Sequence, residues 1–359
     1  MPLAAGMLLL GALYRGNIPL PQEGVLTKDA IARTLLETEL GAVWKDELPC
    51  GTDSEPELAL PPVEESGEEE VHLPAADSSC DPPPAEEPAA EVPEDGGSAV
   101  ERTMKANGKT VLGPVEVNNS TEHLSVDTEA IANSVLDRTI RPASEGPQIL
   151  IMHTHATEAY TMAGEDQYTE TDYARTDDPN YNVIRVGDEI QRILEEMGFS
   201  VLHDTTLYDY PSYTGSYTRS LQGVRAQLEA NPTIAVVLDV HRDALIAEDG
   251  TVYKAVTEYE GEKTAQVMLV IGTNDGGLDH PNWQSNLNVA AHIQQGMTGV
   301  EPTLARPINL RSQRFNQHLT PASMIVEVGT SGNTLQEALR GAAHFARSAG
   351  EVYKTMLAE

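Results

Sequence analysis

Histidine and carboxylate side chains follow the apolar runs of this sequence at spacings that suit a hydrolytic metal site. The run QILIM is followed by His155 and, three residues later, by Glu158, while His241 directly follows the run IAVVLDV. Two imidazoles and one carboxylate form a three-ligand set that is typical of catalytic zinc, with water at the fourth position. We therefore predict that these three residues bind Zn²⁺.

A fourth residue, Glu327, has the properties of a catalytic base. It lies inside the apolar run PASMIVEVG, where an isolated carboxylate is costly to bury unless its charge is used. A carboxylate beside zinc-bound water can take its proton, while the ion lowers the pKa of that water to roughly 7 and polarises the carbonyl under attack. The sequence therefore predicts amide hydrolysis without a covalent intermediate.

Three neighbouring residues leave alternatives open. His153 precedes His155 by two positions, and period-two alternation would place both on one side, so His153 is an alternative ligand or orients one. Asp243 is an alternative ligand or holds the tautomer of a ligand histidine. Arg242 binds a substrate carboxylate through two nitrogens. Alternatively, either Arg242 or Asp243 simply forms a surface pair. A lone histidine more often has only a packing role, but the combination favours a metal.

Alternating apolar strands and amphipathic helices must position these residues. We predict strands at 148–153, 199–203, 234–240, 267–271 and 324–328, and helices at 182–197, 220–230, 283–297 and 334–356. In open sheets of this kind, ligands bind beyond the carboxyl ends of the strands, where the candidate residues stand. The predicted fold class is α/β, with sheet and helices in three layers.

The composition divides the chain into three segments. Residues 1–50 contain a short helix and the apolar run 2–14, which is shorter than the roughly 18 to 20 residues that cross a bilayer, so we expect a complete anchor to need residues upstream. Residues 51–109 are an acidic, Pro-rich linker, because the stretch 51–100 holds 15 Asp and Glu, 9 Pro and no Lys or Arg. Residues 110–359 form the predicted zinc hydrolase domain.

Charge and motif content exclude several classes of function. The formal net charge of -33 repels polyanions, so nucleic acid is not an expected partner. No Walker A, GxGxxG or GxSxG pattern occurs, which removes the usual nucleotide-binding and serine hydrolase interpretations.

Five segments of the sequence together resemble the stage II sporulation protein P family: ILIMHTHATEAY, NVIRVGDEI, VVLDVHRDA, IGTNDGGLDHPNWQSNLNVA and RFNQHLTPASMIVEVGTSGNTLQEA. The resemblance implies a zinc-dependent peptidoglycan hydrolase similar in fold to the N-acetylmuramoyl-L-alanine amidases. Such an enzyme cleaves the amide between N-acetylmuramic acid and the L-alanine of the stem peptide, with endopeptidase activity on cross-links as well. On this chain the family motifs correspond to His153, His155, Glu158, His241, Arg242, Asp243 and Glu327.

The same resemblance implies a biological setting. It implies action during engulfment of the forespore, at the outer surface of the mother-cell membrane that faces the forespore. It also implies membrane attachment through an N-terminal anchor, and stage II sporulation protein D, a lytic transglycosylase, as a partner.

Two other functions fit the same residues. A zinc carboxypeptidase-like or polyglutamyl hydrolase would use Arg242 or Arg311 for the terminal carboxylate and would release single amino acids. A non-catalytic scaffold that binds the cell wall would keep its function in the presence of a chelator. The sequence leaves open the balance of amidase and endopeptidase activity, the oligomeric state and the identity of the divalent ion.

Overall fold

A computed structural model describes residues 99–164, 166–247 and 249–358 of the chain. The strands are β1 (Val100–Arg102), β2 (Thr110–Val111), β3 (Val117–Asn119), β4 (Ile149–Met152), β5 (Val201–His203), β6 (Val236–Asp243), β7 (Tyr253–Tyr259), β8 (Glu262–Ala265), β9 (Val267–Gly272), β10 (Ile308–Arg311) and β11 (Ala322–Thr330). The α-helices are α3 (Thr128–Ala132), α4 (Val183–Glu196), α5 (Ser216–Ala230), α6 (Trp283–Val300) and α7 (Leu335–Thr355). The strands and long helices predicted around the candidate residues are thus confirmed, with shifted ends.

The strands form one large sheet and one small sheet. The large sheet has the order β2-β3-β10-β9-β11-β6-β4-β5, and the small sheet has the order β1-β7-β8. Strands β4, β6 and β11 are neighbours and run parallel, whereas β9 is antiparallel to β11. The carboxyl ends of β4, β6 and β11 therefore meet at one edge of the sheet.

The chain reverses its direction across the sheet between β4 and β6. It passes from β4 through α4 to the edge strand β5, and then returns through α5 to β6 on the other side of β4. Right-handed crossovers in opposite directions place their helices on opposite faces of the sheet. The end of β4 and the end of β6 thus flank a topological switch point, which is where open α/β sheets bind ligands.

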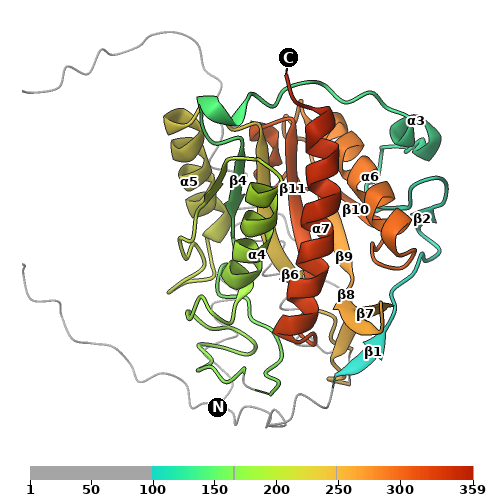
Figure 1. The fold of residues 1–359 in the computed structure, drawn as a ribbon. Coiled ribbons are helices and arrows are strands. Elements are labelled where there is room, and N and C mark those ends of the chain that lie inside the picture. Colours follow the sequence, from blue (N-terminus) through green and yellow to red (C-terminus); the bar gives the residue numbers. More distant parts are fainter. Residues whose placement is uncertain (1–98, 165, 248, 359) are drawn as a thin grey trace, which may run out of the picture. The chain divides into compact units, whose positions relative to one another are not determined.

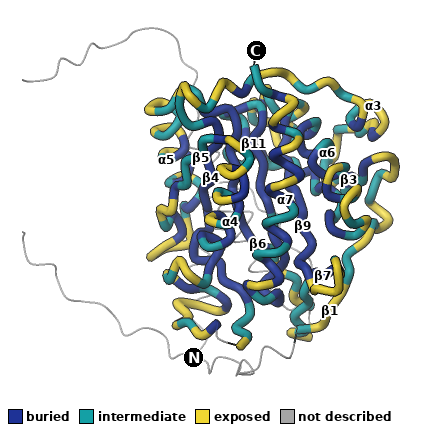
Figure 2. Tube along the Cα trace, in the orientation of Figure 1, coloured by how far each residue is buried: buried dark blue, intermediate teal, exposed yellow. Residues whose placement is uncertain are grey.

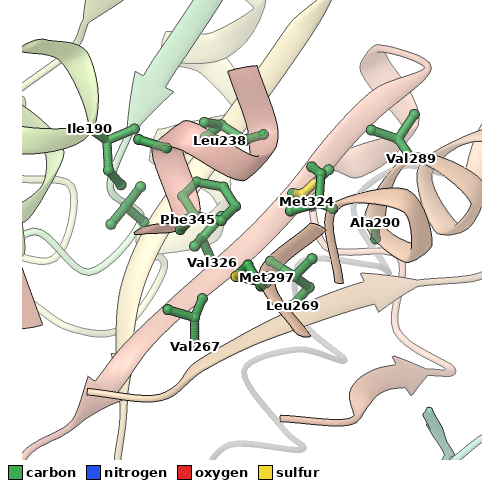
Figure 3. Close-up of a cluster of buried hydrophobic side chains, with 14 of the residues drawn as sticks. Ile190, Leu238, Val267, Leu269, Val289, Ala290, Met297, Met324, Val326 and Phe345 are labelled. Atoms are coloured by element: carbon green, nitrogen blue, oxygen red, sulfur yellow. The ribbon is translucent and has the colours of Figure 1, made fainter. Parts of the chain in front are cut away.

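Helices α4, α6 and α7 cover one face of the sheet, in front of the strands in Figure 1. Helix α4 begins after Asn182, whose side chain accepts from the Ile184 N–H, and α7 begins at a capping box of Thr334 and Glu337. Their apolar stripes pack on the strands. The side chains labelled in this core are Ile190, Leu238, Val267, Leu269, Val289, Ala290, Met297, Met324, Val326 and Phe345 (Figure 3). The central strands are buried along most of their length (Figure 2).

Helix α5 and the loop after β10 cover the opposite face. Leu150, Met152 and Val237 of the sheet pack with Val224 of α5 in a second apolar cluster. Further along, Met268, Val270 and Ile325 pack against Phe315. The polar candidates on β6 and β11 lie on this second face. Because both faces of the sheet are covered, the domain has three layers, as predicted.

The small sheet brings the start of the described chain into contact with the domain. Strand β1 pairs with β7 in parallel from Val100, before residue 110, where the sequence predicts that folding resumes. The apolar run 2–14, the short N-terminal helix and most of the predicted linker lie outside the described residues. Within residues 99–358, apart from the undescribed positions 165 and 248, no helix has the length and apolar character needed to cross a membrane.

Candidate active site

Strands β6 and β11 place His241 and Glu327 side by side. The two residues are Cα partners in the parallel pairing, so their side chains leave the same face of the sheet. Asp239, two residues before His241, shares this face and is the partner of Met152 at the end of β4. Three buried strands therefore fix the base candidate and one ligand candidate relative to each other.

His241 is held between two carboxylates. Its Nε2 lies 2.7 Å from Oδ1 of Asp239, and its Nδ1 lies 3.3 Å from Oε2 of Glu158. Burial acts to lower the pKa of His241, but the two carboxylates outweigh burial and raise this pKa well above the usual value. The contact with Asp239 fixes the orientation of the ring and leaves Nδ1 facing Glu158.

Glu158 is fixed by groups on two segments, β6 and the loop that carries Arg175. The backbone N–H of Arg242 donates to Oε2 over 3.1 Å, and a guanidinium nitrogen of Arg175 lies 3.6 Å from Oε1. Burial acts to raise the pKa of Glu158, but the hydrogen bond with His241 and the nearby cationic groups hold it below the usual range. The carboxyl group is therefore ionised and oriented toward His241.

His155 is buried, and its Nδ1 makes no hydrogen bond. Its ring stacks on Tyr213 with centroids 4.4 Å apart and an interplanar angle of 9°, and it meets the His241 ring edge-on at 5.3 Å. Burial is the main cause that lowers the pKa of His155 to about 3. The imidazole is thus neutral at physiological pH and retains a nitrogen without a partner.

Glu327 is half-buried, and its Oε2 is buried without a hydrogen-bond partner. Burial is the largest cause that raises the pKa of Glu327 to about 8, and the charge of Asp243 is the second largest. A carboxyl group with a pKa near the working pH can both accept and return a proton, which is the property required of a general base and acid.

His153 and His155 do not share one side, so the alternation expected from the sequence is wrong. Strand β4 ends at Met152, and the chain turns over residues 154–157. His153 lies under α4, where a Cβ added to Gly187 would come within 2.9 Å of its ring. Its Nδ1 is 2.8 Å from the Val240 carbonyl oxygen and its Nε2 is 2.8 Å from Nε2 of His203, so both ring nitrogens are engaged.

Arg242 and Asp243 have other partners than the sequence suggested. The buried guanidinium of Arg242 donates to the carbonyl oxygens of Ala159 and Ala174 over 2.8 and 2.9 Å. Asp243 forms an ion pair with Arg306 at 2.8 Å. The carboxylate that orients the candidate ligand His241 is that of Asp239. Arg242 binds backbone carbonyl oxygens and so connects backbone segments.

Sequence reasoning missed Asp239 and Arg175, and it did not connect Tyr213 with His155. Asp239 lies within IAVVLDV, and an isolated carboxylate in an apolar strand is the same signal that identified Glu327. Arg175 and Tyr213 lie in irregular segments, where side-chain contacts follow from the fold and not from sequence spacing.

A family model described as Stage II sporulation protein P matches residues 65–349. The chain belongs to the stage II sporulation protein P family. A protein named Stage II sporulation protein P from Bacillus subtilis (strain 168) is 28% identical over 223 residues, which are 58% of this chain and 50% of that relative. The chain thus spans about half the length of this curated relative.

Two solved structures are similar to this chain. The CwlD amidase from Clostridioides difficile, in complex with the GerS lipoprotein, is 14% identical with a TM-score of 0.36, covering 58% of this chain and 98% of that one. The N-acetylmuramoyl-L-alanine amidase AmiC2 of Nostoc punctiforme is 9% identical with a TM-score of 0.35, covering 57% and 96%.

The donor atoms of this stage II sporulation protein P family member have the chemistry of a zinc site. No group of three or more His, Cys, Asp or Glu side chains in the described part of the chain is arranged to hold a metal ion. However, Nδ1 of His241 and Oε2 of Glu158 are 3.3 Å apart, which matches the edge of a tetrahedron with zinc–ligand distances of roughly 2.0 to 2.1 Å. His155 adds a neutral imidazole with a buried nitrogen that has no hydrogen bond. Two imidazole nitrogens and one carboxylate oxygen are donor types that zinc binds in proteins.

Proposed function

We propose that this protein is a zinc-dependent peptidoglycan hydrolase that cleaves the amide between N-acetylmuramic acid and the L-alanine of the stem peptide. The observation that carries the proposal is the register pairing of Glu327 with His241, which sets an unpartnered carboxyl oxygen beside the His241–Glu158 pair. Membership of a sporulation protein family supports a role in remodelling the cell wall.

His155, Glu158 and His241 would hold the metal. When bound, zinc supplies a Lewis acid that polarises the scissile carbonyl and makes a bound water acidic. Asp239 keeps the His241 ring in place through Nε2, which leaves Nδ1 for the metal. His153, with both nitrogens engaged, supports the sheet end beneath α4.

Glu327 moves the proton in this proposal. Its carboxylate takes a proton from the attacking water, and the resulting carboxylic acid returns a proton to the nitrogen that leaves. In the metal-free protein burial raises the pKa of Glu327 to about 8, and a metal ion bound beside it would lower this pKa toward the working pH, where proton uptake and return are balanced. The same groups would hydrolyse a peptide cross-link, which extends the proposal to endopeptidase activity.

The proposal also assigns a location and partners. Residues 110–359 would act on peptidoglycan outside the cytoplasm, at the mother-cell membrane facing the forespore. An N-terminal anchor would tether them there, and the lytic transglycosylase stage II sporulation protein D would cut the glycan strands. The family resemblance supports these assignments. The carboxypeptidase alternative is less favoured, since the Arg242 guanidinium already binds backbone carbonyls.

Digestion of purified sacculi tests the proposal. Protein loaded with zinc should release intact stem peptides that begin with L-alanine, as identified by mass. A chelator should stop the release, and added zinc should restore it. Release of single amino acids would instead indicate a carboxypeptidase, and wall binding that survives the chelator without any released fragment would indicate a scaffold.

A further inference from the structure

We propose that Tyr213 and Arg175 form a clamp that positions His155 and Glu158 for metal binding. This inference rests on the zinc site proposed above and adds two positioning residues to it. Both lie in irregular segments that flank the site, Arg175 between β4 and α4 and Tyr213 between β5 and α5. Neither supplies a ligand atom.

The two candidate histidine ligands are oriented in different ways. A histidine that binds a metal usually donates its other ring N–H to a carboxylate or carbonyl, which fixes the ring. His241 has such a partner in Asp239 at 2.7 Å. No hydrogen bond among the described residues involves a ring nitrogen of His155, so whichever nitrogen binds the metal, the other has no such partner, and the best-defined neighbour of the ring is the parallel Tyr213 ring at 4.4 Å. The stacked ring therefore takes the orienting role that a hydrogen bond has at His241.

Arg175 connects this stacked ring to the carboxylate ligand. Its guanidinium carbon lies 4.9 Å from the centre of the Tyr213 ring, and one of its nitrogens lies 3.6 Å from Oε1 of Glu158. Its other terminal nitrogen pairs with Oδ2 of Asp209 at 2.8 Å, and the Asp209 side chain is fully buried. One guanidinium thus supports His155 through Tyr213 and supports Glu158 directly.

The backbone holds both parts of the clamp in place. Ala174 adopts a φ of 48°, uncommon for a residue with a Cβ, and its carbonyl accepts hydrogen bonds from the Ala159 N–H and from Arg242. Arg219 donates to the carbonyl oxygens of Tyr208 and Thr214 over 2.6 and 2.9 Å and so secures the loop that carries Tyr213. Tyr213 is 39% exposed, yet its position is determined by these contacts.

Zinc affinity in a series of Tyr213 variants tests the clamp. Tyr213→Ala and Tyr213→Leu remove the ring and should weaken zinc binding about 10-fold, the lower end of the effect of losing a group that orients a metal ligand. Tyr213→Phe keeps the ring and should bind zinc as the wild type does. Tyr210→Ala is the matched control, because Tyr210 lies in the same loop, is 46% exposed and should leave affinity unchanged. Thermal melts confirm that each variant folds.

A second measurement follows the His155 ring without metal. In the full-length protein with chelator, the Tyr213 ring current should shift the His155 carbon-bound ring protons upfield in the NMR spectrum, and Tyr213→Ala and Tyr213→Leu should remove that shift. With Co²⁺ in place of zinc, the same two variants should change the visible absorption spectrum, and Tyr213→Phe should not.

Two results would overturn the clamp. If the wild type binds zinc and Tyr213→Ala binds it equally tightly, the clamp fails while the proposed hydrolase stands. If the wild type binds no zinc, the proposed function fails and the clamp fails with it.

Discussion

Replacing Glu327 by glutamine should stabilise the protein and abolish most of its activity. The substitution keeps the shape of the side chain but removes a half-buried carboxyl group whose Oε2 is buried and unpartnered. Burial and the nearby Asp243 raise its pKa from 4.5 to about 8, so ionisation is unfavourable in the folded protein. Glutamine removes this cost and also removes the proposed base.

The size and sign of the effect follow from this pKa. Between pH 4.5 and 8 the folded protein keeps a proton on Glu327 that the unfolded chain has lost, so the free energy of unfolding falls as the pH rises. Each unit of pKa difference corresponds to about 1.4 kcal/mol, which gives about 3 kcal/mol at pH 7 and about 5 kcal/mol above pH 8 as upper values. Glu327→Gln should show an advantage of this order at pH 8 and almost none at pH 4.5.

Urea unfolding with chelator present, at several pH values, measures this difference. The matched control is Glu337→Gln, which changes a buried carboxylate that accepts from Lys254 and Asn333 over 2.8 and 2.9 Å and should therefore destabilise by about 1 to 3 kcal/mol. Digestion of sacculi with the zinc-loaded Glu327→Gln variant should be slower by about 10²- to 10⁴-fold, with zinc content retained. A parallel pH dependence of wild type and variant would refute the burial argument, and near wild-type digestion would remove Glu327 from the mechanism.

Three further substitutions have expected outcomes. His241→Ala should lower the zinc stoichiometry measured by elemental analysis, and unchanged metal content would count against the proposed ligand set. Asp239→Asn should weaken zinc binding by about 10- to 100-fold in a chelator competition, since Asp239 orients His241, and unaltered affinity would show that it does not. Gly187→Ala should destabilise by about 1 to 3 kcal/mol, because a Cβ there would lie 2.6 Å from His203, whereas Gly299→Ala on α6, with no atom within 4 Å, should stabilise by up to about 1 kcal/mol. Equal melting temperatures for these two glycine variants would contradict the packing described around His153.

The elements that position the site were predictable because their apolar patterns are long and regular. Strand β6 reads as a continuous apolar run, and α4 carries apolar residues at helical spacing that are all buried in the structure. The β7–β8 hairpin and the short strands β1 to β3 were not predicted. Strand β1 is exposed throughout, β2 has only two residues, and β7 and β8 have buried residues in succession, so no alternating pattern develops.

The contacts within the site were predictable only where the sheet imposes them. The pairing of Glu327 with His241 follows from adjacent parallel strands, and both had been selected as residues at strand ends. The separation of His153 from His155 could not be anticipated, because it depends on the residue at which β4 ends. The partners of Arg242 and Asp243 depend on segments far away in the sequence, which spacing alone does not bring together.

Anomalous diffraction at the zinc absorption edge, from crystals of the zinc-loaded full-length protein, tests the central claim most directly. The account predicts one strong peak within roughly 2.0 to 2.2 Å of His155, Glu158 and His241, with the Glu327 carboxyl group beside it. A peak bound by other residues, or no peak between these three side chains in protein that contains stoichiometric zinc, would contradict it.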